Sequence, residues 1–352
     1  MTTLQSLLDG FKAATTPASI PAAGTGTLPP ALAAGFEAAT TSAPIPAVAL
    51  GTAPSPSFIG DDAITVPAGG FSALYAFGDS LSDAGNVSIG TLGTVPVGSI
   101  YSEGRFTNGN VWVQDLAQNL GLPPVKPSLA GGTDFAIGGA ETGATAVHAA
   151  NPTDLTAQLG QFVASVPKPS PGALYTVWAG SNDVLDIANS TETPAQQQAS
   201  VQQAVNNEVN SIDGLIAHGA KDLVVLNIPD LGKTPYEMAR PASDADSTML
   251  AKTYNADLGA ALQKIMSTGA ASIDYVNTFG LLDTAIANPA AYGFTNVTQP
   301  VWNGNLTSAT SGTLAATGAV QNKYVFFDGL HPTAAAHALL ADAVTQGLTG
   351  TA

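Results

Sequence analysis

Residues 76–86 have the sequence AFGDSLSDAGN, and the organisation of the whole chain follows from this stretch. The apolar run Ala73–Phe77 leads into it and is typical of a short buried strand, which ends at Gly78 before a cluster of small and acidic residues. Ser80 therefore lies just past the carboxyl end of a strand, where open α/β sheets bind their ligands. If a helix follows directly, its first N–H groups point back at Ser80 and stabilise negative charge there. On this stretch alone, Ser80 is explained equally well as a nucleophile or as a residue that caps a turn.

The composition of the chain excludes several classes of protein. Its 352 residues are 45% hydrophobic and 10% charged, and ten Lys and Arg against 26 Asp and Glu give a formal net charge of −16. The apolar content is ample for a sizeable core, whereas no basic patch is present for nucleic acid or an anionic membrane surface. The absence of cysteine removes disulfides, thiol nucleophiles and thiolate metal sites together. No secretory signal and no apolar stretch of membrane-spanning length is recognisable, so we expect no integral membrane segment.

The first 70 residues differ in composition from the rest of the chain. They are rich in Pro, Ala and Thr, and GFKAATTPASIP at 10–21 recurs as GFEAATTSAPIP at 35–46, with nine identities in twelve positions. Two copies are too few for a solenoid, and this composition favours an extended or disordered chain. We therefore expect an N-terminal arm over 1–70 and one folded domain over 71–352. A role of the arm in secretion, oligomerisation or docking is the alternative to a plain linker.

From residue 71 onward, apolar strands alternate with amphipathic helices. The expected strands are nearly continuous apolar runs, as in a parallel sheet covered on both faces, and they are Ala73–Phe77, Ala173–Ala179, Asp222–Ile228 and Ser272–Val276, with Tyr324–Phe327 as a short strand or extended run. Apolar residues at helical spacing predict helices over 111–120, 195–218 and 247–267. This alternation predicts an α/β fold with the three layers of an α/β/α sandwich.

A long uncharged segment precedes the last part of the chain. Residues 284–322 contain no charged side chain but include Tyr292, Phe294 and Trp302. The segment is explained either as an ordered surface insertion or as a loop wall over a functional site, because the residues that follow it carry chemistry.

One of the four histidines has the context of a catalytic base. His331 lies in FDGLHP at 327–332, directly after an apolar segment, with Asp328 three residues earlier and a glycine between the two. This spacing brings a carboxylate to the imidazole and fixes its tautomer, as a Ser-His-Asp triad requires. The other histidines are more simply structural or surface residues: His148, which has no carboxylate within three residues, His218 and His337.

Two further turns bring hydrogen-bond donors to the same edge of the predicted sheet. GSND at 180–183 ends the second strand, so that the Asn182 amide projects above the edge, and GGTDFAIGGA at 131–140 exposes backbone N–H groups. Attack on an ester carbonyl develops an oxyanion, and the loss of one of its donors typically costs about 3–4 kcal/mol of barrier. Either turn alone would be a routine loop. Together with Ser80 and His331, they supply the parts of an acyl-transfer site.

Four motifs in this order resemble those of the GDSL-type, or SGNH, hydrolases. They are FGDSLSDAGN at 77–86, DFAIGGA at 134–140, GSND at 180–183 and DGLHP at 328–332. GRFTNGNVWVQDLA at 104–117 also resembles the branch of lipases, haemolysins and autotransporter esterases. The resemblance runs from about residue 73 to the C-terminus and leaves the first 70 residues uncovered. Asp134 stands where many relatives have Asn, at a position that is structural in the family.

The resemblance implies a flavodoxin-like fold with a mostly parallel five-stranded sheet. It implies that Ser80 is the nucleophile, that His331 is the general base, and that Asp328 orients the imidazole and supports it electrostatically. A serine hydroxyl is a weak nucleophile near neutral pH and needs such a base to take its proton. No Gly-x-Ser-x-Gly elbow is present, and the family's serine turn is more open.

The resemblance also implies an oxyanion hole. It combines the Ser80 N–H, the Gly138 N–H and the Asn182 side-chain amide, and Gly139 replaces Gly138 if the alignment of the motif slips by one residue. The acidic neighbours in the motifs are expected to brace loops and not to carry protons: Asp79 and Asp183.

These observations predict serine-dependent hydrolysis of carboxylic esters through an acyl-enzyme, with a small-molecule or lipid ester as partner. The sequence has no His-Glu-x-x-His or comparable ligand set, so we expect no metal and no cofactor. A phospholipase or lipid acyltransferase is the first alternative, and a non-catalytic surface or binding protein is the second. The resemblance favours an extracellular or cell-surface location. The acyl and alcohol specificity and the oligomeric state stay open.

Overall fold

The structure, a computed structural model, describes residues 64, 66–67, 70–240 and 244–350. Both copies of the repeat, and most of the predicted arm, lie outside the described residues. Ile64 and Val66 precede the predicted domain boundary but pack onto the core, and the Ile64 N–H donates to the Asp274 carboxylate at 3.1 Å. The boundary and the role of the arm stay predictions.

Four parallel strands form the sheet, in the order β1-β2-β3-β4. Their register sets Leu74 opposite Leu174 and Asp222 opposite Ser272. The four coincide with the first four expected runs: β1 (Leu74–Gly78), β2 (Leu174–Trp178), β3 (Asp222–Leu226) and β4 (Ser272–Val276).

The expected fifth strand is not a regular strand. Residues 133–137 run parallel to β1 at its outer edge, where three backbone hydrogen bonds of 2.8–3.1 Å join the two segments. They take the place of a fifth strand beside β1, but the glycine pair that follows them ends the pairing after this short contact. Residues 324–327, which the sequence offers as a short strand or extended run, form an extended run with isolated bridges.

The helices surround this sheet. Their bounds are α2 (Asn86–Gly90), α3 (Trp112–Asn119), α4 (Leu155–Ser165), α5 (Ser181–Ala188), α6 (Pro194–Ala217), α7 (Pro235–Met238), α8 (Asp244–Met266), α9 (Thr278–Ala287) and α10 (Ala334–Thr349), with short 3-10 turns η1 (Ser128–Ala130), η2 (Leu231–Lys233), η3 (Pro289–Tyr292) and η4 (Gly318–Lys323). The expected helices correspond to α3, α6 and α8. A helix directly after Ser80 does not form, because residues 79–85 make turns and α2 begins only at Asn86. None of the described helices has the length and apolar character needed to cross a membrane.

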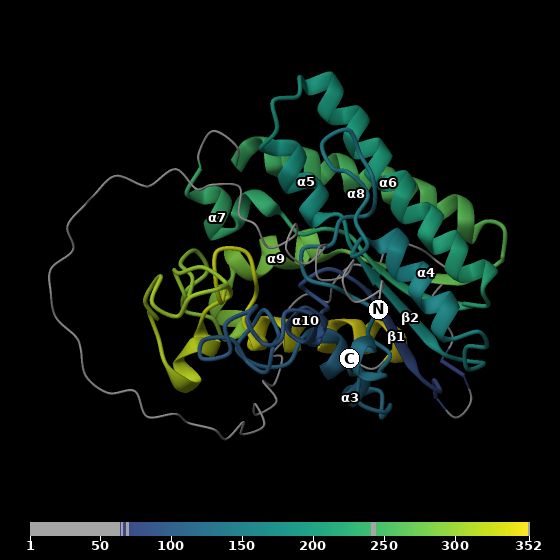
Figure 1. Cartoon of the computed structure of the whole chain (residues 1–352), viewed down its shortest axis with the longest axis horizontal. Coiled ribbons are helices and arrows are strands. Elements are labelled where there is room, and N and C mark those ends of the chain that lie inside the picture. Colours follow the sequence, from purple (N-terminus) through teal and green to yellow (C-terminus); the bar gives the residue numbers. More distant parts are fainter. Residues whose placement is uncertain (1–63, 65, 68–69, 241–243, 351–352) are drawn as a thin grey trace, which may run out of the picture.

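The sheet is buried between two layers of helices, as the sequence predicts (Figure 1). Successive side chains of a strand point to opposite faces. Phe77 therefore joins the core cluster under α4, α5, α6 and α8, whereas Ala76 joins the cluster under α3 and α10. The fold is a three-layer α/β/α sandwich, and the carboxyl ends of its strands share one edge.

The uncharged segment 284–322 is anchored to this edge by aromatic side chains. Trp302 is 1% exposed and packs with Tyr101 and Phe327. The backbone N–H of Trp302 donates to the Phe327 carbonyl at 2.6 Å. Phe294 packs with Val325 and Phe326. These contacts hold the segment against the loop that carries His331.

Candidate active site

Ser80 lies in a tight turn at the carboxyl end of β1. Gly78 makes this turn possible, because its φ is +144° and a Cβ there would lie 2.0 Å from the Trp178 carbonyl oxygen. The carboxylate of Asp79 then closes the turn by accepting the Leu81 N–H at 2.9 Å. Asp79 thus braces the loop, and Ser80 is set at the edge of a cavity with 9% of its surface exposed.

The structure brings together Ser80, His331 and Asp328. The Nε2 atom of His331 lies 2.8 Å from the Ser80 Oγ, across 251 residues of sequence. On the other side of the ring, Nδ1 lies 2.8 Å and 2.9 Å from the two carboxylate oxygens of Asp328. All three side chains are buried or nearly so, and the imidazole therefore stands between a hydroxyl and a carboxylate in the order that a Ser-His-Asp triad requires.

Tyr101 is a member of this arrangement that the sequence does not reveal. Its hydroxyl donates to the Asp328 Oδ2 at 2.7 Å, and it is 2% exposed. The Asp328 Oδ1 also accepts the backbone N–H groups of Leu330 and His331, at 2.9 and 2.8 Å. Tyr101 lies 227 residues from Asp328, and a tyrosine just before the GRFTNG motif is the only local signal for it.

The groups around His331, above all Asp328, favour the protonated, charged form of its imidazole. Burial by itself lowers the pKa of His331, but the charge and hydrogen bond of Asp328, together with the charge of Asp79, raise this pKa above the usual value for histidine. Burial conversely raises the pKa of Asp328, but His331 and the two backbone N–H groups bring it below its usual value. The ring of Phe106 packs over the imidazole with centroids 5.1 Å apart. Asp328 thus stays ionised while His331 gains and loses a proton.

Two of the predicted oxyanion donors, Asn182 and Gly138, already donate to other acceptors in the structure. The Asn182 Nδ2 donates to the Ala140 carbonyl at 2.8 Å, which ties α5 to the glycine turn, and its distance to the Asp79 Oδ2 is 3.5 Å. The Gly138 N–H donates to the Asp83 Oδ2 at 2.8 Å. The N–H of Gly138 is therefore already engaged in a hydrogen bond to Asp83.

Gly139 differs from Gly138 in exposure and in the partner of its N–H. It is partly exposed, whereas Gly138 is buried, and its φ is +78°. Among the described residues, neither the Gly139 N–H nor the Ser80 N–H has a hydrogen-bond partner. Which of the two glycines donates to an oxyanion stays a prediction.

Buried carboxylates brace the loops around the site. Asp83 accepts three N–H groups of residues 85–87 at 2.5–3.1 Å in addition to that of Gly138, and burial raises its pKa to about 6 although these bonds lower it. Asp134 accepts the N–H groups of Ala84 and Ala136, so it is structural here. Asp183 in the same way accepts both the N–H and the hydroxyl of Thr142.

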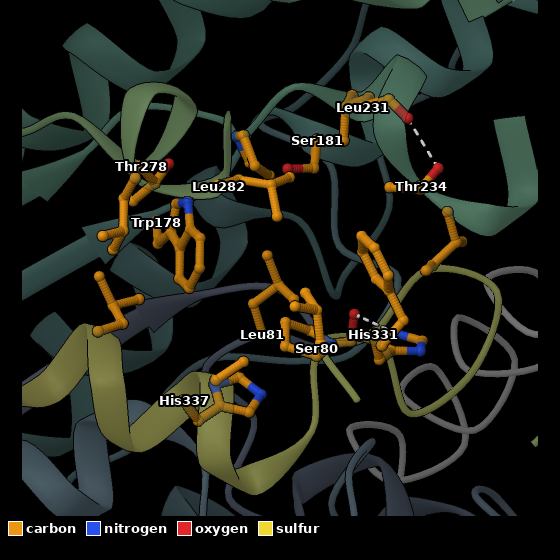
Figure 2. A pocket seen from close by; sticks show the side chains of 18 of the residues that line it. Ser80, Leu81, Trp178, Ser181, Leu231, Thr234, Thr278, Leu282, His331 and His337 are labelled. Carbon is orange, nitrogen blue, oxygen red and sulfur yellow. Dashed lines mark hydrogen bonds between the residues drawn. The ribbon is translucent and has the colours of Figure 1, made fainter. Parts of the chain in front are cut away.

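A largely apolar cavity of about 120 Å³ opens beside Ser80 and His331 (Figure 2). Helices α9 and α10 and the segment 284–322 contribute to its wall, the last through Phe294. The apolar part of the wall includes Leu81, Trp178, Leu185, Leu231, Leu281, Leu282, Ala285, Val325, Phe326 and Leu340. Such a wall accepts an apolar chain next to the serine hydroxyl.

The remaining histidines lie outside the triad. His337 lines the cavity, and burial followed by the charge of His331 lowers its pKa to about 3, so that it is neutral. The Nε2 atom of His218 lies 2.8 Å from the Val166 carbonyl. His148 has carboxylate partners beyond the three residues on either side: Glu141 and Asp154.

Comparison with known proteins identifies the family. The model of the family described as GDSL-like lipase/acylhydrolase matches residues 74–344. A phosphatidylcholine-sterol acyltransferase of Aeromonas hydrophila is 28% identical over 331 residues, which cover 80% of this chain and 92% of that protein. A GDSL esterase/lipase of Arabidopsis thaliana is 27% identical, covering 79% of this chain and 87% of that protein. Esterase EstA of Pseudomonas aeruginosa is 30% identical, covering 77% of this chain and 46% of that protein. The chain belongs to the GDSL-like lipase/acylhydrolase family.

Proposed function

We propose that this protein hydrolyses carboxylic esters through an acyl-enzyme formed on Ser80. One observation carries the proposal: the Ser80 Oγ lies 2.8 Å from the His331 Nε2, while Asp328 holds the opposite nitrogen of the ring. This hydrogen bond lets the imidazole take the hydroxyl proton as the oxygen attacks the ester carbonyl.

The reaction proceeds in two halves. In the first, the Ser80 Oγ bonds to the carbonyl carbon, and its proton passes to the His331 Nε2. Collapse of the tetrahedral intermediate breaks the bond to the alcohol oxygen, which leaves with that proton. In the second half, His331 takes a proton from water as the water oxygen bonds to the acyl carbon. The bond between this carbon and the Ser80 Oγ then breaks, the carboxylic acid leaves, and the proton passes from His331 to the Ser80 Oγ. Asp328 stays ionised throughout and stabilises the imidazolium.

Three donors stabilise the oxyanion in this proposal: the backbone N–H groups of Ser80 and Gly139 and the side-chain amide of Asn182. Gly139 replaces Gly138 because the N–H of Gly138 is bound by Asp83. Asn182 donates one amide hydrogen to the Ala140 carbonyl at 2.8 Å, and the second, which faces the Asp79 Oδ2 at 3.5 Å, turns to the oxyanion when the substrate binds. Removal of such a donor typically lowers kcat by about 10²–10³-fold.

The test is hydrolysis of 4-nitrophenyl esters from acetate to palmitate by the full chain. Ser80→Ala and His331→Ala are expected to lose at least about 10⁴-fold in kcat/KM. Ser88→Ala is the matched control, because Ser88 lies on α2 outside the cavity and its loss leaves activity unchanged. A folded wild type that is inert towards every chain length would overturn the proposal.

The apolar cavity supports an acyl or alcohol chain of appreciable length as part of the substrate. Leu282 lies in its wall on α9, and Leu282→Trp fills part of the space. This variant is expected to keep activity on the acetate and lose it on the octanoate. Equal losses on both esters would place the substrate chain elsewhere.

A second candidate is transfer of the acyl group from a lipid to an alcohol in place of water. It is favoured by the apolar cavity and by the similarity to the acyltransferase of Aeromonas hydrophila. Incubation with phosphatidylcholine and an added sterol separates the two reactions. Free fatty acid indicates hydrolysis, and sterol ester indicates transfer.

A further inference from the structure

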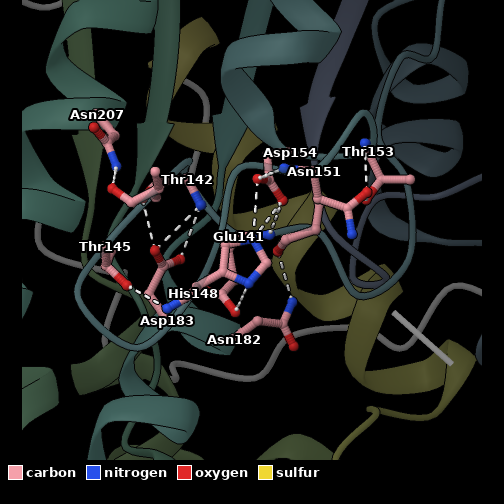
Figure 3. A network of polar contacts seen from close by, with 12 residues as sticks. Glu141, Thr142, Thr145, His148, Asn151, Thr153, Asp154, Asn182, Asp183 and Asn207 are labelled. Carbon is pink, nitrogen blue, oxygen red and sulfur yellow. Dashed lines mark hydrogen bonds and ion pairs between the residues drawn. The ribbon is translucent and has the colours of Figure 1, made fainter. Parts of the chain in front are cut away.

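A network of polar side chains follows the glycine turn in the sequence and includes residues of α5 (Figure 3). His148 is at its centre, between two buried carboxylates. Its Nδ1 atom lies 2.8 Å from the Glu141 Oε1, and its Nε2 atom lies 3.0 Å from the Asp154 Oδ2. The three residues come from different parts of the segment that joins the glycine turn to α4.

Carboxyl groups outnumber basic groups in this cluster. Beside Glu141 and Asp154, it contains Asp183 and Asp186 of α5, which both act electrostatically on Glu141. Within the described residues, the ion pairs that these carboxylates form are with His148.

Three of these side chains also have the geometry of a ligand set. One ring nitrogen of His148 and one carboxylate oxygen each of Glu141 and Asp186 lie within 4.8 Å of one another. The Glu141 side chain is only 4% exposed, and its carboxyl group faces that of Asp186, yet its Oε2 atom accepts no hydrogen bond from an N–H or O–H group of the described residues. A buried carboxylate oxygen without a donor is costly unless a ligand satisfies it.

We propose that Glu141, His148 and Asp186 bind a divalent transition-metal ion, with zinc as the best fit. One imidazole nitrogen with two carboxylate oxygens suits zinc and its first-row neighbours, whereas calcium and magnesium prefer oxygen ligands alone. Tetrahedral zinc holds its ligand atoms roughly 3.3 Å apart. Asp186 is exposed, so rotation of its side chain brings the third ligand into place and solvent supplies the fourth.

The hydrogen-bond partners of His148 are arranged as they typically are around a metal-binding histidine. Such a histidine typically donates its second ring N–H to a carboxylate, which fixes the tautomer and orients the ring. Asp154 holds this position at Nε2, and its Oδ2 also accepts the Asn151 N–H at 2.7 Å. The metal takes the place of the proton on Nδ1, which is released to solvent.

The location connects this site to the catalytic edge. Glu141 directly follows Ala140, whose carbonyl accepts the Asn182 amide. Asp186 lies one turn after Asn182 on the same face of α5. A metal ion held by Glu141 and Asp186 therefore ties together the two elements that carry oxyanion donors.

The test is zinc binding to the full chain after exhaustive dialysis against EDTA. We expect one equivalent of zinc per chain in equilibrium dialysis, and a rise in Tm of about 5 °C when free zinc is a hundred-fold above Kd. Manganese is expected to act in the same direction, and calcium and magnesium at the same concentration are expected to have little effect. The readout is independent of esterase activity, so its outcome does not depend on the proposed function.

Two variants distinguish a built site from general attraction to an acidic protein. Asp186→Asn, at an exposed position, and His148→Gln are expected to weaken zinc binding at least ten-fold. Asp213→Asn, an exposed carboxylate on α6, is expected to bind zinc as the wild type does. No retained zinc, equal binding by Asp186→Asn and Asp213→Asn, or equal effects of calcium and zinc would each overturn the proposal. The wild-type stoichiometry decides the matter even if His148→Gln fails to fold.

Discussion

The hydroxyl of Tyr101 controls how strongly Asp328 attracts the proton on His331. Tyr101→Phe removes one donor from the carboxylate but keeps the ring that packs edge-on against Phe327 with centroids 5.1 Å apart. The less stabilised carboxylate then holds the imidazolium more tightly, and the pKa of His331, already raised, rises further. Because the proposed mechanism needs a neutral His331 to take the serine proton, we expect the acid limb of the kcat/KM profile to move up by about 0.7 pH unit, equivalent to about 1 kcal/mol.

The measurement is the pH dependence of kcat/KM on one 4-nitrophenyl ester between pH 5 and 9. Tyr324→Phe is the matched control, since Tyr324 packs in the same apolar cluster but its hydroxyl makes no hydrogen bond among the described residues. A uniform loss of activity without movement of the limb would mean that Tyr101 acts by packing alone.

The sequence motifs predicted Ser80, Asp328 and His331 as one group, although Ser80 lies 251 residues from His331, but they missed contacts that no motif encodes. Asp328 and His331 are three residues apart, so their contact follows from a motif. Tyr101 reaches Asp328 only through the tertiary fold. His148 likewise has its carboxylate partners six and seven residues away in the sequence, in a segment without a regular helix whose spacing would predict these contacts. The N–H of Gly138 is directed by Asp83, a contact that no spacing within the glycine motif encodes.

At the scale of elements, the pairing of β1 with β2 depends on Gly78. A Cβ at Gly78 would lie 2.0 Å from the Trp178 carbonyl oxygen, and its φ of +144° is unfavourable for any other residue. We expect Gly78→Ala to destabilise the protein by roughly 3 kcal/mol or more, measured by denaturant unfolding. Gly160→Ala on α4 is the control, because nothing lies within 4 Å of the added methyl and alanine favours a helix by about 1 kcal/mol. Equal effects of the two substitutions would contradict this account.

The helices and strands also show which parts of this fold can be predicted from the sequence. The strands β1 to β4 were predicted because each is a buried apolar run, and α3, α6 and α8 because their apolar residues recur at helical spacing. The segment 133–137 was not, since only three backbone hydrogen bonds join it to β1 and its neighbours are glycines. Helix α5 was also missed, because its sequence SNDVLDIA mixes motif residues with too few apolar positions to show a period.

For the whole molecule, buried acidic groups set the dependence of stability on pH. Burial, the largest cause in each case, raises the pKa of Asp183 and Glu208 to about 8, that of Glu141 to about 7, and those of Asp79 and Asp83 to about 6. A carboxyl with a higher pKa in the folded than in the unfolded chain binds more protons when folded. The free energy of unfolding therefore decreases as the pH rises from about 4 to about 8.

The histidines modify this slope without reversing it. Asp154 and Glu141 raise the pKa of His148 to about 10, so its contribution is complete below the unfolded pKa of 6.5 and is lost as the pH rises towards 10. His337 acts in the opposite direction, because burial lowers its pKa to about 3 and its contribution is lost as the pH falls from 6.5. A single opposing group leaves the balance with the carboxyls.

We therefore expect stability and activity to change in opposite directions with pH. Tm is expected to be at least about 5 °C higher at pH 5.5 than at pH 8.5 at constant ionic strength, whereas kcat/KM increases over the same interval as His331 loses its proton. Glu208→Gln, which replaces one buried carboxyl by a neutral group, should reduce the difference in Tm between the two pH values. Calorimetry of both proteins checks this. A Tm that increases with pH would mean that these carboxyls are ionised in the folded chain, so that their charge is balanced by groups or ions other than protons.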